Sequence, residues 1–127
     1  MTLTVNLEIK AGADYRHDFI VYESDDDSTP RDLTGDELEA TFRQGDAKGR
    51  ELFTLKLGDG LDILDPLGGR FRMTIARNLT ESLNFRETEI EGTFDVELTD
   101  ASGFPRSRAV EGSHVITQDN TRGNNGG

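Results

Sequence analysis

Residues 92–115 read GTFDVELTDASGFPRSRAVEGSHV, and this stretch decides the fold. Its first half alternates between polar residues on one side of an extended chain and three apolar residues on the other: Phe94, Val96 and Leu98. Turn-forming residues follow over 99–103. Pro105 lacks a backbone N–H, so the return strand must start after it or run along a sheet edge. The stretch therefore predicts a β-hairpin with one buried face.

Further alternating runs lie upstream of this hairpin. They cover residues 3–9, 15–22, 38–43, 53–57, 61–64 and 70–75. In residues 15–22 the pattern leaves open which face is inward. With a return strand around 106–118, the count reaches about seven or eight, at spacings typical of antiparallel sandwiches and barrels. We predict an all-β, immunoglobulin-like antiparallel β-sandwich, although a small jelly roll would show the same pattern.

One short helical turn is expected near residues 78–85. Asn78 could cap it, Glu81 follows three residues later, and Leu79 and Leu83 lie four residues apart. Because the apolar spacing ends there, the helix should not exceed one or two turns.

The length of 127 residues suits one domain of about 100 to 150 residues. We assign residues 1–118 to a single β-sandwich domain. Residues 119–127 contain no apolar side chain and are expected to form a flexible tail. The first residues lack the basic region and apolar core of an export signal, and no run approaches the roughly 18 apolar residues of a membrane span.

Charge and cysteine content narrow the possible partners. The chain holds 25 acidic and 14 basic residues, a net charge of −11, which repels phosphate backbones and anionic lipid surfaces. We therefore expect neither nucleic acid nor membrane as a partner. The absence of cysteine excludes disulfides and thiolate metal sites.

Two segments could be considered for calcium. The acidic run over 24–29 places Asp25, Asp26 and Asp27 together, and Ca²⁺ takes about six to eight oxygen ligands. The spacing does not match an EF-hand loop, and a solvated charge run is the simpler interpretation. Residues 58–64 resemble one turn of a calcium-binding nonapeptide repeat, but such repeats work only when stacked, so we expect a turn between two strands.

No catalytic constellation is predicted. His17 and His114 fall in predicted strands, where a surface or hydrogen-bonded structural role is expected. Asp95 and Glu97 share the predicted solvent face of their strand, where a carboxylate pair should have no raised pKa to exploit. Since no nucleophile, base and orienting group can be assembled, we expect neither an enzyme nor a cofactor.

The basic residues are few and local. Arg70 and Arg72 share the strand face opposite Phe71 and Met73, and Arg77 follows them. Such a stripe could meet an acidic patch on an identical neighbour. Ordinary surface charges are the alternative.

Several of these segments together resemble small virion proteins of tailed bacteriophages. The resemblance lies in the strand over 3–9 followed by a glycine, in Pro-Arg-Asp-Leu-Thr-Gly at 30–35, in the strand over 38–43 and in the hairpin over 92–115. The similar family members carry an immunoglobulin-like domain, as in upper baseplate proteins and tail or fibre-attachment modules. In this chain Phe94 stands where tyrosine is usual, and the acidic connection over 87–92 departs from the pattern.

The resemblance implies a structural component of the virion, in the tail or baseplate or attached to the capsid as a decoration protein. It implies contacts with other virion proteins and a homo-oligomer within the assembly, without an active site. As interface residues we select Arg70 and Arg72, together with three residues of the return strand: Arg106, Arg108 and Gly112. The alternative is a calcium-dependent adhesion or glycan-binding module that uses Asp25, Asp26 and Asp27.

Overall fold

The structure is a computed structural model. It describes residues 3–23, 29–46, 48–83, 89–100 and 106–118, without the side chain of Arg106. The turn predicted over 99–103 falls mostly outside these residues, and the tail predicted over 119–127 lies entirely outside them.

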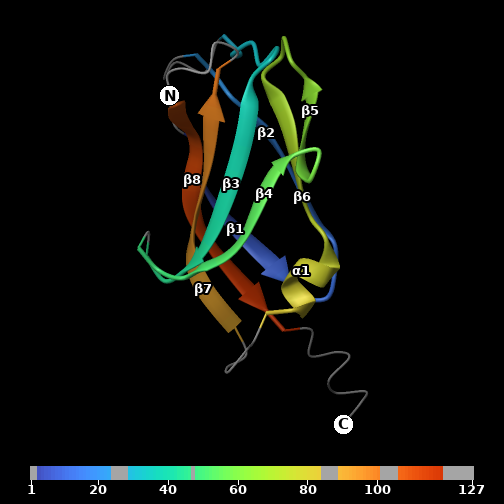
Figure 1. The fold of residues 1–127 in the computed structure, drawn as a ribbon, viewed down its shortest axis with the longest axis vertical. Coiled ribbons are helices and arrows are strands. Elements are labelled where there is room, and N and C mark those ends of the chain that lie inside the picture. Colours follow the sequence, from blue (N-terminus) through green and yellow to red (C-terminus); the bar gives the residue numbers. More distant parts are fainter. Residues whose placement is uncertain (1–2, 24–28, 47, 84–88, 101–105, 119–127) are drawn as a thin grey trace.

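Eight strands and one short helix form the described part of the chain (Figure 1). In chain order they are β1 (Leu3–Lys10), β2 (Tyr15–Ile20), β3 (Glu37–Gln44), β4 (Glu51–Leu57), β5 (Gly60–Asp65), β6 (Arg70–Ile75), α1 (Arg77–Glu81), β7 (Glu89–Thr99) and β8 (Arg106–Thr117). Each strand predicted from alternation is present, and β8 begins directly after Pro105. The all-β class is therefore confirmed.

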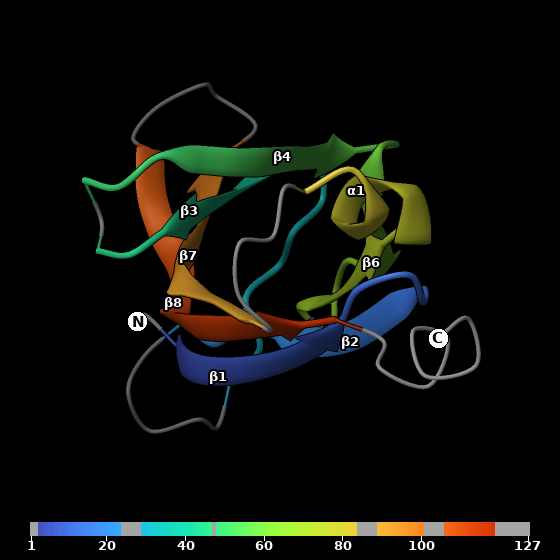
Figure 2. The ribbon, with the colours of Figure 1, turned by 90° about the horizontal axis from the view of Figure 1, so that it is seen from below.

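The strands are hydrogen-bonded in the order β1-β8-β7-β3-β4-β5-β6-β2. β4 and β5 share just two residue pairs, Lys56 with Gly60 and Leu57 with Leu61, at a tight corner. The sheet is thus divided into a five-strand layer, β1-β8-β7-β3-β4, and a three-strand layer, β5-β6-β2. Viewed from below, the strands curve around the core as in a barrel, with β4 along one side and β1 and β2 along the opposite side (Figure 2).

This strand order is that of an immunoglobulin-like sandwich. The third, seventh and eighth strands form the middle of one sheet, β4 extends it as in variable-type domains, and the second, sixth and fifth strands form the other. Two pairings differ from the predicted antiparallel arrangement: β4 runs parallel to β5 over their two residue pairs, and β1 runs parallel to β8. β1 and β8 come from opposite ends of the chain, so no tight hairpin dictates an antiparallel pairing.

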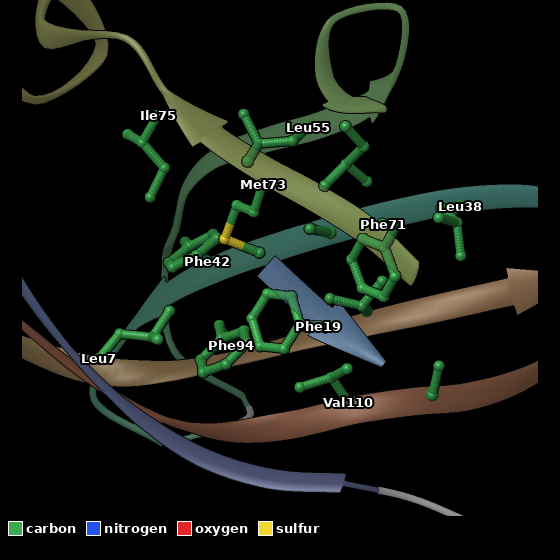
Figure 3. Packing of buried hydrophobic residues seen from close by; sticks show 14 of the residues in the cluster. Leu7, Phe19, Leu38, Phe42, Leu55, Phe71, Met73, Ile75, Phe94 and Val110 are labelled. Carbon is green, nitrogen blue, oxygen red and sulfur yellow. The ribbon is translucent and has the colours of Figure 1, made fainter. Parts of the chain in front are cut away.

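The core lies between the layers and is built from the inward faces of the strands (Figure 3). Phe42 is fully buried, and its ring centroid lies 4.7 Å from that of Phe53 and 5.1 Å from that of Phe94. In the facing layer, the rings of Phe19 and Phe71 stack at 5.1 Å. Such aromatic pairs contribute about 0.5–1.5 kcal/mol beyond the area they bury.

Packing also settles two points that alternation left undecided. In β2 and the residue after it, Phe19 and Val21 are buried while Ile20 faces outward. β7 begins at Glu89, so most of the connection expected over 87–92 is strand, with Ile90 buried opposite Ile116. The apolar alternation looked interrupted there because Gly92 occupies an inward position.

Helix α1 starts one residue before the expected cap. Ala76 is the N-cap and Asn78 lies inside the helix, so the predicted capping role of Asn78 is wrong. Instead, the backbone N–H of Arg77 donates to Oδ1 of Asp14 at 2.8 Å. Buried Thr80 accepts a hydrogen bond from the N–H of Gly12 at 3.1 Å. These bonds fasten the helix to the turn between β1 and β2.

Among the described residues, no helix has the length and apolar character that crossing a membrane requires.

Candidate functional site

A buried histidine links three strands of the five-strand layer. His114 on β8 is 3% exposed, and its Nε2 lies 2.8 Å from the backbone oxygen of Arg43 on β3. Because that oxygen can only accept, Nε2 must carry the hydrogen, so Nδ1 is the unprotonated nitrogen. Nδ1 is buried and finds no hydrogen-bond partner among the described residues.

Gly92 makes this link possible. It lies on β7 between His114 and β3, and pairs with both His114 and Gln44. A Cβ atom at this position would come 1.8 Å from the Arg43 oxygen and 2.7 Å from Nε2 of His114. The ring can therefore cross β7 only where the intervening residue is glycine.

The surroundings of His114 keep it neutral. Burial lowers the pKa of the imidazole below its ordinary value of 6.5, although the hydrogen bond to Arg43 acts in the opposite direction. The ring also contacts Phe42, with centroids 5.4 Å apart. His17 lies on β2 between the rings of Tyr15 and Phe19. The structure thus places both histidines in structural positions.

The Asp-Leu-Thr-Gly segment that contributes to the family resemblance closes one end of the core. Oδ1 of Asp32 accepts hydrogen bonds from the N–H and the hydroxyl of Thr34 at 2.9 and 2.6 Å. These bonds hold the pKa of Asp32 below its ordinary value. Leu33 between them is fully buried, and its N–H donates to the backbone oxygen of Pro66 at 2.9 Å. The segment is therefore an ordered turn that places Leu33 in the core.

Arg72 forms an ion pair with Asp18 in its own layer. It lies directly opposite Asp18, and its Nε and Nη2 donate to the two carboxylate oxygens at 2.8 and 3.2 Å. This bidentate bond lowers the pKa of Asp18. Arg70, two residues earlier, is exposed and pairs in register with Ile20. Within the described part of the chain, its guanidinium makes no ion pair or hydrogen bond.

Arg108 lies on the outer face of the other layer. Its Nη1 is 3.2 Å from Glu111, and its Nη2 is 3.9 Å from Asp95. Partial burial, together with the nearby charge of Glu97, raises the pKa of Asp95 even though Arg108 opposes the shift. The expectation that the Asp95 and Glu97 pair has no raised pKa is therefore wrong. The Asp95 side chain is only 23% exposed, and its neighbours in register are Thr41 on β3 and Glu111 on β8.

The remaining predicted interface residues lie on the same strand as Arg108. Gly112 sits between Val5 on β1 and Phe94 on β7, and a Cβ atom there would come 1.6 Å from the Val5 oxygen. Its place is thus inside the sheet, where it permits close approach of β1. The backbone of Arg106 pairs with Thr99, and its side chain lies outside the described residues. The structure does not gather the five residues, since Arg70 and Arg72 lie on the three-strand layer.

Of the two segments considered for calcium, one lies within the described residues. Residues 58–64 contain the tight turn between β4 and β5, as expected, with the N–H of Asp59 donating to the oxygen of Lys56 at 2.8 Å. Asp25, Asp26 and Asp27 lie outside the described residues. Among those described, no group of three or more histidine and carboxylate side chains is placed to hold a metal ion.

Two hollows mark the outer face of the five-strand layer. The larger, about 620 Å³, lies where β1, β8 and β7 meet the turn after β3, and three carboxylates line it: Glu8, Asp46 and Glu91. The smaller, about 290 Å³, lies over β3, β4 and β7 and is lined by Glu37, Leu38, Glu39, Lys56, Leu57, Glu97 and Thr99. Each draws residues from strands far apart in the chain, so neither could be found from local sequence.

Comparison with known proteins assigns no family. No protein-family model matches the chain, and no curated protein matches it significantly.

Proposed function

We propose that this chain is a structural component of a tailed-phage virion, in the tail or baseplate or attached to the capsid, and that it acts through contacts with other virion proteins. The observation that carries the proposal is the strand order. The resemblance implies an immunoglobulin-like domain, and the eight strands are arranged as in one. Fold alone does not specify function, so the argument also depends on what the matching segments do.

Those segments carry structural roles. Residues 30–35 form the turn that seats Leu33 in the core, and residues 92–115 include the two strands at the centre of the five-strand layer. This placement supports a building block better than a reaction centre.

The outer surfaces suit association. From Glu51 to Leu55, β4 has β3 on one side and no strand partner on the other among the described residues. An open edge of this kind can accept a strand from another protein. Both layers also present charged outer faces, and ordered pairs such as Asp18 with Arg72 hold their side chains in place. Fixed side chains lose less conformational entropy on binding.

The proposal is tested on particles. If it holds, mass spectrometry of gradient-purified virions detects this chain at a constant ratio to the major capsid protein. The chain also stays with the particles through a wash in high salt that removes loosely bound proteins. Absence from particles, or a ratio that varies between preparations, would refute the proposal.

A further inference from the structure

The large apolar side chains exposed in the described chain gather at one end of the three-strand layer. They are Ile20, Leu64 and Leu67, with 38%, 41% and 73% of their surface exposed. Single exposed apolar residues are common, but a contiguous group at one place marks a contact surface. We refer to these three residues and Arg70 as the apolar corner.

Strand register brings the members of the apolar corner together. Ile20 on β2 pairs directly with Arg70 on β6, and both face outward because their neighbours Phe19 and Phe71 are buried. Leu64 is the extra residue of a bulge in β5, next to Asp65, which pairs with Arg70 from the other side. Bulges of this kind redirect a side chain at a sheet edge.

Leu67 is held in an ordered turn between β5 and β6. The N–H of Gly69 donates to the oxygen of Pro66 at 3.2 Å, and that of Gly68 donates to Oδ1 of Asp65 at 3.1 Å. A rigid turn presents the leucine without the entropy cost of ordering a loop. Leu67 is 73% exposed, so its side chain is available for contact with a partner.

A complementary surface exists on the same molecule. We call the 290 Å³ hollow over β3, β4 and β7 the acidic hollow. Three of its lining residues are glutamates, whereas Lys56 is the one cation, already 3.7 Å from Glu39. Glu37 at its rim is exposed, and half-buried Leu57 adds an apolar wall. The acidic hollow thus offers Arg70 further carboxylates, in addition to Asp65 of its own layer, and a recess for Leu67.

We propose that the apolar corner of one copy of this chain docks into the acidic hollow of a second copy, with Leu67 in the cavity and Arg70 facing Glu37. The two surfaces lie on different layers, so one molecule cannot join them internally. Because the contact uses two different patches, it is heterologous and repeats into a ring or an open filament. The inference rests on the proposed function in one respect, the expectation of a homo-oligomer within the virion.

Sedimentation velocity of the full chain tests the contact. At physiological salt, where charges are screened beyond about 8 Å, the mean sedimentation coefficient should rise with concentration up to about 1 mM, the range of a weak contact. Leu67→Ser and Arg70→Glu should each weaken the association by about tenfold or more. Arg50→Glu makes the same charge change at an exposed site on the β3–β4 turn and should leave association at the wild-type level.

A charge swap identifies the partner surface. Glu37→Lys alone should also weaken association, while Glu51→Lys, the matched control at the start of β4, should not. The double variant Arg70→Glu/Glu37→Lys restores opposite charges across the contact and keeps the wild-type net charge of −11. It should therefore recover association that either single variant loses.

Three results would overturn the inference. One is a wild-type chain that stays monomeric over the whole range, and another is association that Leu67→Ser and Arg70→Glu leave intact. The third is a dimer that Arg70→Glu disrupts but Glu37→Lys does not, since this would mean that the apolar corner binds itself. A monomeric chain that is still present in virions at fixed ratio refutes this contact alone. A self-associating chain that is absent from virions refutes the proposed function alone.

Discussion

Mild acid should destabilise the fold through one residue, His114. Its pKa is lowered by burial from the ordinary 6.5, so the folded state binds fewer protons than the unfolded state just below that pH. The contribution of His114 to the free energy of unfolding is therefore fully present above pH 6.5. It is lost as the pH falls toward the lowered pKa of the folded protein. One proton gives a slope of at most about 1.4 kcal/mol per pH unit.

The structure explains why the proton is resisted. Nε2 already donates to the Arg43 oxygen, so a second proton must go to Nδ1, which is buried and has no partner among the described residues. Protonation would thus place a charge in the core beside Phe42. Ordinary carboxylates titrate mainly below the pH range in which His114 should lose stability. Their effect on unfolding can therefore be separated from that of His114.

Urea unfolding at a series of pH values from about 5 to 8 measures this slope. Wild type should lose stability on acidification between these limits. His114→Gln removes the titrating group and should show a flatter dependence, at the cost of a lower overall stability. His17→Gln is the matched control and should keep the wild-type slope, because His114 remains. An unchanged slope in His114→Gln would refute the reasoning.

Three further predictions concern the core, the strand crossing and calcium. Phe42→Ala should reduce the free energy of unfolding by about 3–5 kcal/mol, whereas Leu67→Ala should change it by less than about 0.5 kcal/mol. Urea unfolding measures both, and similar losses from the two variants would contradict the assigned core. Gly92→Ala places a methyl group against the Arg43 oxygen, so it should cost at least about 1–3 kcal/mol in the same assay, and a neutral outcome would exclude the close approach. Millimolar calcium should not shift the melting temperature. A rise that disappears when residues 25–27 are changed to asparagine would instead support a cation site, because a ligand at about 100 times its Kd adds about 2.7 kcal/mol to the free energy of unfolding.

Alternation was enough to locate the strands, because each has one buried face. It could not supply the pairing of β1 with β8, which joins the two ends of the chain in parallel and depends on the whole topology. The start of β7 was misplaced for a local reason. Gly92 takes an inward position that apolar residues usually fill, and His114, itself polar, occupies the space that the glycine leaves.

The candidate surfaces were harder to predict than the fold. Arg70 and Arg72 share a face as expected, yet Asp18 engages Arg72 from a strand more than fifty residues earlier in the chain. The acidic hollow likewise combines glutamates from β3 and β7. The raised pKa of Asp95 depends on how far the neighbouring strands bury its side chain, which local alternation does not encode.

We propose above that this chain is a building block of a phage particle. Electron cryo-microscopy of purified virions tests it most directly. We expect density at the tail, the baseplate or the capsid surface into which the eight-strand sandwich fits, with side-chain features that match the stacked rings of Phe42, Phe53 and Phe94. A virion map in which all protein density is accounted for by other chains would contradict it.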